Sequence, residues 1–327
     1  MEYRQLGNSA LKLSAITYGS FAIGGTMWGG TEKNDARKAI LTSIDHGITT
    51  LDTAPFYGFG LSEELIGESI KDRDRSAIQI LTKFGMVWDG SNNGKGDFMM
   101  DIDQDGKKYP IYKYASKANV MKEVEESLQR LRTDYIDLLQ LHWPDSTTPI
   151  EETMEAMQLL IDQGKIRAAG VSNYNEVQML RAQEHINLAS NQVPYSMLKR
   201  QIEAKVIPAA VENLIGIIAY SPLERGLLTG KFFNGNALKS DDHRNGYFSQ
   251  FDLDKVKSLL ERIEPIAQEK GATLSQLVLK WTTLQKGVTV VLAGARNEEQ
   301  AISNAGAVDI DLSNDELDLI NKAVNSL

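Results

Sequence analysis

The sequence has no cysteine among its 327 residues. This absence excludes disulfides, thiolate catalysis and cysteine-ligated metals, and it leaves the redox compartment open. The sequence also has no uninterrupted apolar stretch near the ~18 residues of a membrane-spanning helix. Residues 1–14 carry no basic cluster followed by an apolar run. We therefore expect a cytoplasmic protein with neither a secretory signal nor a membrane segment.

An excess of positive charge is also missing, because 35 Lys and Arg face 44 Asp and Glu, for a formal net charge of −9. Nucleic acids and anionic membranes attract clustered Lys and Arg, so neither is expected as a partner. The hydrophobic share of 42% and the charged share of 24% are ordinary for a globular protein with a large core. No stretch reads as a linker, so we predict one domain over residues 1–327.

Short apolar runs alternate with segments of helical period along the chain. We predict strands near 15–20, 48–52, 78–84, 136–142, 167–172, 188–193, 215–220 and 289–293. Helices are predicted near 34–46, 61–72, 117–131, 150–163, 175–184, 203–213, 254–285 in two pieces, and 298–305. Eight such alternations favour a single (β/α)8 TIM barrel of the α/β class over an open doubly wound sheet. The G-x-G-x-x-G fingerprint of that open sheet is absent, because Glu63 stands where its third glycine would follow Gly58-Phe59-Gly60.

Helix starts carry recognisable capping residues. Thr148, followed by proline and then a carboxylate, predicts an N-cap with proline at the first helical position. Asn175, Thr273 and Ser313 each precede Gln or Glu by three residues, which is the spacing of a capping box. These four positions predict where helices begin.

Two connections are longer than usual: residues 85–116 after the third strand and 221–253 after the seventh. Long connections in a compact domain are usually functional, and both are expected on the rim formed by the strand ends. Within the first, residues 98–112 predict a hairpin. Residues 101–106 copy the first half of a calcium-binding EF-hand loop, but Tyr112 stands where the bidentate Glu is needed, so no metal site is predicted.

Four polar residues follow the apolar runs closely: Asp52, Tyr57, Lys83 and His142. The carboxyl ends of parallel barrel strands meet at one rim, where catalytic side chains collect. Taken alone, Lys83 or Asp52 is more simply explained as part of a structural ion pair. The four together predict a site that moves a hydride and a proton.

Longer motifs carry a resemblance to a known family. They are GITTLDTAPFYGFGLSEELIGESIK (47–71), LTKFG (81–85), RLRTDYIDLLQLHWPD (130–145), GKIRAAGVSN (164–173), NQVPYS (191–196), AYSPLERGLLTGK (219–231) and GARNEEQ (294–300). In content and order they resemble the aldo-keto reductases over nearly the whole chain. The resemblance implies a (β/α)8 barrel that binds a nicotinamide cofactor without a Rossmann domain, with Asp52, Tyr57, Lys83 and His142 as its catalytic tetrad.

The chemistry of these four residues can be argued from their functional groups. Carbonyl reduction places negative charge on oxygen as hydride reaches carbon, so a proton donor must stand at that oxygen. Tyr57 is the predicted acid; the pKa of a free tyrosine is about 10, and we expect the nearby Lys83 to lower it. Asp52 would hold Lys83 in place and keep it charged. His142 would donate to the carbonyl oxygen and orient the substrate.

The resemblance also implies the cofactor contacts. Ser172, Asn173 and Gln192 match the positions that bind the nicotinamide carboxamide. Tyr220 matches the aromatic residue on which the nicotinamide ring stacks; a tyrosine that only packs at the barrel end is the alternative. The remaining positions are expected around the pyrophosphate, at Ser221, Pro222, Leu223, Gly226, Gly230 and Lys231, and around the adenosine, at Gly294, Arg296, Gln300 and Asn304.

Arg296 decides which cofactor we predict. A guanidinium beside the N–H groups of a helix start suits a 2′-phosphate, which favours NADP(H) over NAD(H). The Gly226 to Lys231 segment is not a P-loop, because only three residues separate its glycines and Phe232 replaces the required Ser or Thr.

Four aromatic residues flank the predicted mouth of the site and are expected to wall a substrate pocket: Trp28, Phe56, Trp88 and Trp143. The sequence thus predicts an NADPH-dependent reductase of aldehydes or ketones, with small carbonyl or sugar-like substrates, which in reverse oxidises alcohols. The alternative is a cofactor-binding regulatory subunit that resembles potassium-channel β subunits and turns over little substrate. No sequence pattern indicates an oligomeric state.

Overall fold

The structure, a computed structural model, describes residues 1–25, 31–104, 106–233 and 244–327. Its centre is a closed barrel of eight parallel strands, so the predicted (β/α)8 fold is confirmed. In barrel order the strands are β3 (Ile16–Gly19), β4 (Thr50–Asp52), β5 (Gln79–Phe84), β9 (Ile136–Leu141), β10 (Ile166–Ser172), β11 (Leu188–Pro194), β12 (Gly216–Tyr220) and β13 (Val288–Ala293). Each strand ends within two residues of its predicted bounds.

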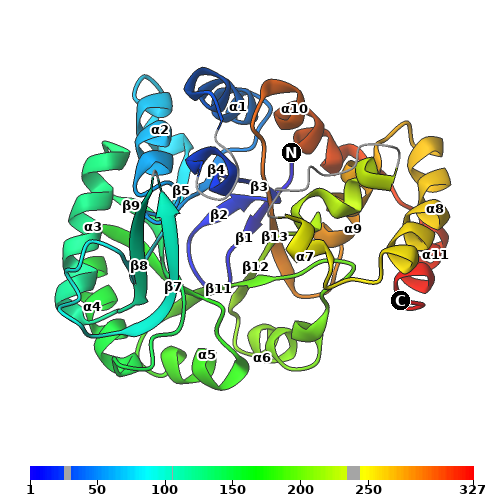
Figure 1. The fold of residues 1–327 in the computed structure, drawn as a ribbon. Coiled ribbons are helices and arrows are strands. Elements are labelled where there is room, and N and C mark those ends of the chain that lie inside the picture. The colour runs from blue at the N-terminus through cyan, green and yellow to red at the C-terminus, as the bar shows by residue number, and fades with distance from the viewer. Residues whose placement is uncertain (26–30, 105, 234–243) are drawn as a thin grey trace.

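Helices surround the barrel, and the chain colour in Figure 1 runs round this ring from α1 to α10, which lies beside α1, while α11 lies beside α8. They are α1 (Lys33–Asp45), α2 (Leu61–Ile70), α3 (Lys117–Leu131), α4 (Ile150–Asp162), α5 (Glu176–Gln183), α6 (Val206–Glu212), α7 (Arg244–Phe248), α8 (Leu253–Glu269), α9 (Leu274–Thr283), α10 (Glu298–Gly306) and α11 (Asn314–Val324). The short α7, inside the long connection after β12, was not predicted. In the described part of the chain, no helix is long and apolar enough to cross a membrane.

The predicted helix caps are confirmed at three of four positions. Asn175, Thr273 and Ser313 each form the full capping box. The prediction for Thr148 was wrong, since α4 begins after Pro149 without a side-chain cap. The Thr148 hydroxyl instead donates to Asp145 Oδ2 at 2.6 Å, because this nearby carboxylate is the stronger acceptor.

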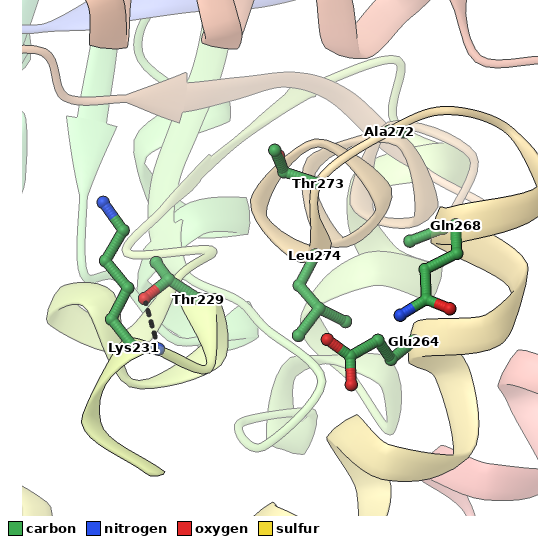
Figure 2. Close-up of a pocket in the computed structure, with 8 residues that line it drawn as sticks. Thr229, Lys231, Glu264, Gln268, Ala272, Thr273 and Leu274 are labelled. Atoms are coloured by element: carbon green, nitrogen blue, oxygen red, sulfur yellow. Dashed lines mark hydrogen bonds between the residues drawn. The ribbon is translucent and has the colours of Figure 1, made fainter. Parts of the chain in front are cut away.

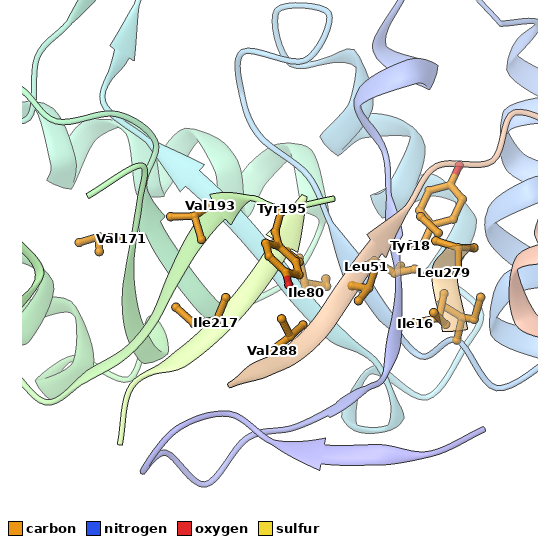
Figure 3. Close-up of a cluster of buried hydrophobic side chains, with 14 of the residues drawn as sticks. Ile16, Tyr18, Leu51, Ile80, Val171, Val193, Tyr195, Ile217, Leu279 and Val288 are labelled. Atoms are coloured by element: carbon orange, nitrogen blue, oxygen red, sulfur yellow. The ribbon is translucent and has the colours of Figure 1, made fainter. Parts of the chain in front are cut away.

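Side chains along the strands alternate between the helix layer and the barrel interior. Ile80 and Ile217 point outward into the large hydrophobic cluster that packs against the helices (Figure 3). Leu81 and Leu138 belong to a second, inner cluster. Because the side-chain period of a strand is two, residues two positions further along face inward as well, nearer the carboxyl end of the barrel.

A hairpin of β1 (Tyr3–Gln5) and β2 (Lys12–Ser14) closes the amino end of the barrel and was not predicted. Leu6, Leu11 and Leu13 are buried against the inner cluster. Gly7 has φ +54° and lies so close to the barrel that a Cβ there would stand 2.5 Å from the Leu214 carbonyl oxygen. The hairpin was not predicted because strands of three residues are too short to show the two-residue alternation of apolar side chains.

A second hairpin stands on the carboxyl rim. The strands β7 (Asp97–Gln104) and β8 (Lys107–Lys113) pair antiparallel, as predicted, and β8 also pairs with β6 (Met86–Val87). Its base is fixed to the loop after β9, because the Ala115 N–H donates to Asp145 at 2.9 Å and the Ser146 N–H donates to Asp97 at 2.7 Å. The hairpin is therefore a fixed part of the rim.

Candidate active site

Asp52, Lys83 and Tyr57 meet at the carboxyl end of the barrel. Asp52 is the last residue of β4, Lys83 lies in β5, and both are 1% exposed. Lys83 Nζ donates to Asp52 Oδ1 at 2.7 Å, to the Thr53 carbonyl at 2.9 Å and to the Tyr57 hydroxyl at 3.2 Å. An ammonium group has three donors. Two of them hold Lys83 in place and the third points at the phenol.

Tyr57 is held by the turn that follows β4. Gly58, Phe59 and Gly60 all have positive φ, and the turn packs on the 3₁₀ helix η1 (Phe21–Gly24). A Cβ at Gly58 would stand 2.0 Å from the carbonyl oxygen of Gly24, so only glycine allows this contact. The close approach fixes the tyrosine above Lys83.

His142 completes the group. It directly follows β9, and its backbone N–H donates to the Phe84 carbonyl at 3.0 Å. Its ring meets the Tyr57 ring edge to face, with 5.7 Å between the centroids. The structure therefore brings all four residues of the predicted tetrad to one place.

The electrostatics of the group follow from burial and from the two charges. Burial raises the pKa of Tyr57, and the positive charge of Lys83 offsets this only in part. Lys83 lowers the pKa of Tyr57, as expected, but the net pKa lies above its usual value, because burial desolvates the phenol more strongly than the sequence indicated. Burial also opposes charge on Lys83, but Asp52 and then Tyr57 hold the Lys83 pKa above its usual value.

The surroundings of His142 disfavour a charged imidazole. Burial, reinforced by the charge of Lys83, lowers the pKa of His142 well below its usual value. A neutral imidazole has one N–H donor and one acceptor nitrogen. The group therefore contains one buried ammonium, one phenol that keeps its proton, and one neutral donor.

Ser172, Asn173, Gln192 and Tyr220 form a connected polar set beside the tetrad. Ser172 Oγ donates to the Gln192 carbonyl at 2.8 Å, and Tyr220 OH donates to Asn173 Oδ1 at 2.9 Å. Asn173 Nδ2 donates to the His142 carbonyl at 3.0 Å, which links this set to the tetrad. The Gln192 side chain reaches further, and Gln192 Nε2 donates to Asp52 Oδ2 at 2.7 Å.

Gln140 shares this buried network and was not singled out from the sequence. It is 0% exposed in β9, two residues before His142. Gln140 Nε2 donates to Asp52 Oδ2 at 3.4 Å, and Gln140 Oε1 accepts from Gln192 Nε2 at 3.3 Å. A polar residue inside an apolar run, at two-residue spacing from a candidate catalytic histidine, is the signal that could have identified it.

The segment from Ser221 to Lys231 leaves β12 in an irregular path. Ser221 has φ +56°, and Gly226 and Gly230 have φ +94° and +77°, which glycine adopts readily. Pro222 is buried, Leu223 is half-buried, and Lys231 is exposed. The segment lines part of a pocket of about 330 Å³. Figure 2 shows Lys231 and Thr229 on one side of it, opposite Glu264 and Gln268 of α8. No tetrad residue lines this pocket, so it is separate from the candidate catalytic group.

Glu224 anchors this segment and was also missed. It is 0% exposed within the 3₁₀ helix η4 (Glu224–Thr229). Its carboxylate accepts from the Ser196 hydroxyl and from the Tyr247 hydroxyl, the latter at 2.5 Å, while Lys199 Nζ lies 3.8 Å away. One buried carboxylate thus ties the segment to the loop after β11 and to α7.

Of the four residues expected around the adenosine, Gly294 and Arg296 precede α10, and Gln300 and Asn304 lie within it. The exposed Arg296 precedes the N-cap Asn297, and its backbone N–H donates to Gln300 Oε1 at 2.9 Å. Asn304 Nδ2 donates to the Gly294 carbonyl at 3.0 Å. The side chains of Gln300 and Asn304 therefore hold the backbone on either side of Ala295, and Arg296 is exposed.

Three of the four expected pocket aromatics lie together on the rim. Phe56, Trp88 and Trp143 belong to one cluster with side chains of the β7–β8 hairpin. The Phe56 ring is 6.4 Å from Trp88 and 6.3 Å from His142, centroid to centroid. Trp28 lies outside the described residues.

Glu123 fastens the start of the hairpin to α3, and sequence reasoning did not identify it. Its two carboxylate oxygens accept from the Gly85 N–H at 3.2 and 3.0 Å. Burial raises the pKa of Glu123 to about 8. Glu123 and Trp88 line one cleft between residues 86–91 and α3.

Comparison with known proteins assigns the chain to a family. The sequence profile of the Aldo/keto reductase family matches residues 15–325. The aldo-keto reductase YhdN of Bacillus subtilis is 39% identical over 305 residues, which cover 92% of this chain and 86% of that protein. An NADH-specific methylglyoxal reductase of Escherichia coli is 33% identical over 327 residues, which cover 98% of each chain.

Other relatives differ in their described roles. A probable voltage-gated potassium channel subunit beta of Arabidopsis thaliana is 32% identical over 332 residues, with 95% of this chain and 92% of that one covered. Among solved structures, the glycerol dehydrogenase of Gluconobacter oxydans superposes with a TM-score of 0.87 at 32% identity, covering 99% of this chain and 95% of the other. The chain belongs to the aldo/keto reductase family.

Proposed function

We propose that this protein is an NADP(H)-dependent oxidoreductase that reduces small aldehydes and ketones to alcohols. The observation that carries the proposal is the contact of Lys83 Nζ with both Asp52 and the Tyr57 hydroxyl, beside His142, at the catalytic end of the barrel. Family membership and oxidoreductase relatives support the reaction class.

The proton is the part of the reaction that these residues handle. Tyr57 donates its hydroxyl proton to the carbonyl oxygen as negative charge develops there. Lys83, 3.2 Å away, stabilises the phenolate that remains, and Asp52 keeps Lys83 charged and aimed. The neutral His142 donates its single N–H to the same carbonyl oxygen and fixes the substrate's orientation.

The residues beside the tetrad fit a nicotinamide cofactor. When bound, a reduced nicotinamide would supply the hydride to the carbonyl carbon. The amides of Asn173 and Gln192 and the hydroxyl of Ser172 offer the donors and acceptors that a carboxamide requires. The half-buried Tyr220 would stack on the ring. The positive-φ glycines at 226 and 230, with Lys231, would receive the pyrophosphate.

Arg296 is the reason for proposing NADP(H) rather than NAD(H). Arg296 directly precedes Asn297, the N-cap of α10, and the N-terminal N–H groups and dipole of a helix favour a phosphate. Gln300 and Asn304 of the same helix hold the neighbouring backbone in shape. One relative is NADH-specific, so the preference has to be measured for this chain.

The substrate is proposed to be a small carbonyl or sugar-like compound. Phe56, Trp88 and Trp143 gather in one cluster with side chains of the rim hairpin, and the Phe56 ring lies beside His142. The relatives described as a methylglyoxal reductase and a glycerol dehydrogenase act on three-carbon compounds. Alcohol oxidation is the same reaction in reverse, with Tyr57 as base.

A regulatory role is the second candidate, favoured by the likeness to a probable potassium channel subunit beta. Such a protein would bind the cofactor tightly and turn over little substrate. The tetrad argues for turnover, because a buried ammonium directed at a phenol costs desolvation that cofactor binding alone does not require.

The test is NADPH and NADH oxidation by the purified protein with a panel of aldehydes, dicarbonyls and ketoses, for the wild type and for Tyr57→Phe. We expect turnover in the wild type and a fall of ~10²-fold or more in the variant, since only the proton donor is lost. Cofactor affinity should not change. Tight cofactor binding without turnover across the panel would favour the regulatory role, and equal turnover in Tyr57→Phe would remove Tyr57 from the mechanism.

A further inference from the structure

The Gln192 side chain crosses the barrel. Counted around the closed sheet, β11 and β4 are four strands apart in either direction. Gln192 Nε2 nevertheless lies 2.7 Å from Asp52 Oδ2, and both residues are buried. A residue proposed to contact the cofactor is thus bonded to the carboxylate that holds Lys83.

The second N–H of the Gln192 amide nitrogen is bonded to Gln140. A primary amide has two N–H donors. Asp52 Oδ2 accepts one from Gln192, and Gln140 Oε1 accepts the other at 3.3 Å. Within the described ranges, no group donates to Gln192 Oε1. The carbonyl oxygen is therefore the part of the Gln192 amide that stays available to a ligand.

The barrel makes room for Gln140 at this level. Gln140 is in register with Lys83 of β5 on one side and with Gly170 of β10 on the other. A Cβ at Gly170 would stand 3.1 Å from Gln140 Cγ and 2.4 Å from Ser190 Oγ. Because φ at Gly170 is not positive, the glycine is needed for space rather than for backbone conformation.

We propose that Gln140 is a positioning residue that fixes the plane of the Gln192 amide, so that Gln192 Oε1 accepts from the NH₂ of the nicotinamide carboxamide. The Asp52 carboxylate alone sets which end of the amide faces inward, because the other end would place two acceptors together. Gln140 adds the second contact that prevents rotation about the Asp52 bond. This inference rests on the proposed function.

Two variants test it, Gln140→Leu and Gln140→Met, of which the second keeps the length of the side chain. Each removes the acceptor for one Gln192 N–H. We expect the affinity for the preferred dinucleotide to fall about 2- to 10-fold, the usual range for one neutral hydrogen bond. Affinity for the matching ADP-ribose, which has the same adenosine and diphosphate but no nicotinamide, should stay at the wild-type value.

A cofactor analogue locates the effect at the carboxamide. In a 3-acetylpyridine dinucleotide a methyl group replaces the NH₂, so the wild type should bind it more weakly than the natural cofactor. The Gln140 variants should have lost most of this discrimination. Gln79→Leu is the matched control, because Gln79 accepts from Thr49 and Thr50 at the opposite end of the barrel; it should keep the wild-type discrimination.

The outcomes distinguish an error in the proposed function from an error in the role of Gln140. If the wild type bound neither dinucleotide nor ADP-ribose, the proposed function would be wrong, and the role of Gln140 would fall with it. If the wild type bound and turned over cofactor but either folded Gln140 variant kept full discrimination, only the role of Gln140 would be wrong. Equal losses for dinucleotide and ADP-ribose would likewise contradict a role at the nicotinamide.

Discussion

Asp52 and Asp137 are both 1% exposed and both paired with cations, but they lie at opposite ends of the barrel. Asp137, near the start of β9, binds Arg75 at 2.7 Å and Arg167 at 3.2 Å, and it also accepts from the Ile80 N–H at 2.9 Å. The two guanidinium groups lie over the Tyr135 ring, 4.1 and 3.8 Å from its centroid. This arrangement fastens strands together.

The partners of the two carboxylates explain the difference. The side chains of Arg75 and Arg167 are 21% and 48% exposed, so their charges stay in contact with water. Lys83 is 1% exposed, and one of its three donors is directed at Tyr57 rather than at a structural acceptor. The amino end uses a buried carboxylate for stability. The carboxyl end keeps a buried charge beside a group that can give up a proton.

The largest expected effect is on stability at the amino end. Asp137→Ala should lower the free energy of unfolding by about 2–4 kcal/mol, because it leaves the buried Ile80 N–H without an acceptor and removes a charge-assisted partner of Arg75. Urea denaturation measures this. Asp72→Ala is the control, since its pair with Lys71 is exposed and should contribute about 0–1 kcal/mol. A loss as small as that of the control would contradict a structural role for Asp137. A lower kcat in the folded Asp137→Ala variant would contradict it as well.

At the carboxyl end, Arg296→Ala should change cofactor binding and leave the denaturation midpoint unaltered. A charge-assisted hydrogen bond contributes about 1.5–3 kcal/mol, so NADPH affinity should fall by roughly one to two powers of ten. NADH affinity should be nearly unaffected, because NADH has no 2′-phosphate. Fluorescence titration with both cofactors decides the point. Equal losses would mean that Arg296 supports the adenosine or the fold.

Removing the rim hairpin should change substrate binding more than cofactor binding or thermal stability. Replacing residues 89–113 with a short Gly/Ser linker removes the hairpin that packs on Phe56 and Trp88. We expect a higher KM for the best substrate and a changed order of preference, with NADPH affinity and Tm little changed. A large fall in Tm would show instead that the hairpin stabilises the barrel.

The smallest effect concerns pH. The raised pKa of Tyr57 keeps the acid protonated, so carbonyl reduction should stay level between about pH 6 and 9 and fall only as pH rises past the usual tyrosine value of about 10. The lowered pKa of His142 removes any change near the ordinary histidine value of about 6.5. An inflection near that value in kcat/KM would show that His142 titrates in the working range.

Some of this comparison can be predicted from the sequence and some cannot. Strand ends were predictable because apolar runs stop at Asp52 and His142, and the family motifs brought in Tyr57 and Lys83. The bond from Gln192 to Asp52 joins residues 140 positions apart across the barrel, and no local pattern indicates it. The pKa of Tyr57 depends on desolvation by several segments at once.

The missed elements have equally specific causes. The hairpin β1–β2 has strands of three residues, too short for a period. Thr148 had the chemistry of a cap, but Asp145 captures its hydroxyl. Glu224 is buried by a segment with irregular backbone, which no periodic pattern describes.

The central claim is that this barrel transfers hydride to a carbonyl carbon while Tyr57 supplies the proton. The most direct measurement uses NADPH deuterated at both C4 positions with a reactive small aldehyde, and mass spectrometry of the alcohol formed by the wild type and by Tyr57→Phe. The account predicts one deuterium on the carbinol carbon of the wild-type product and almost no product from the variant. A wild-type product without deuterium, or equal product from Tyr57→Phe, would contradict it.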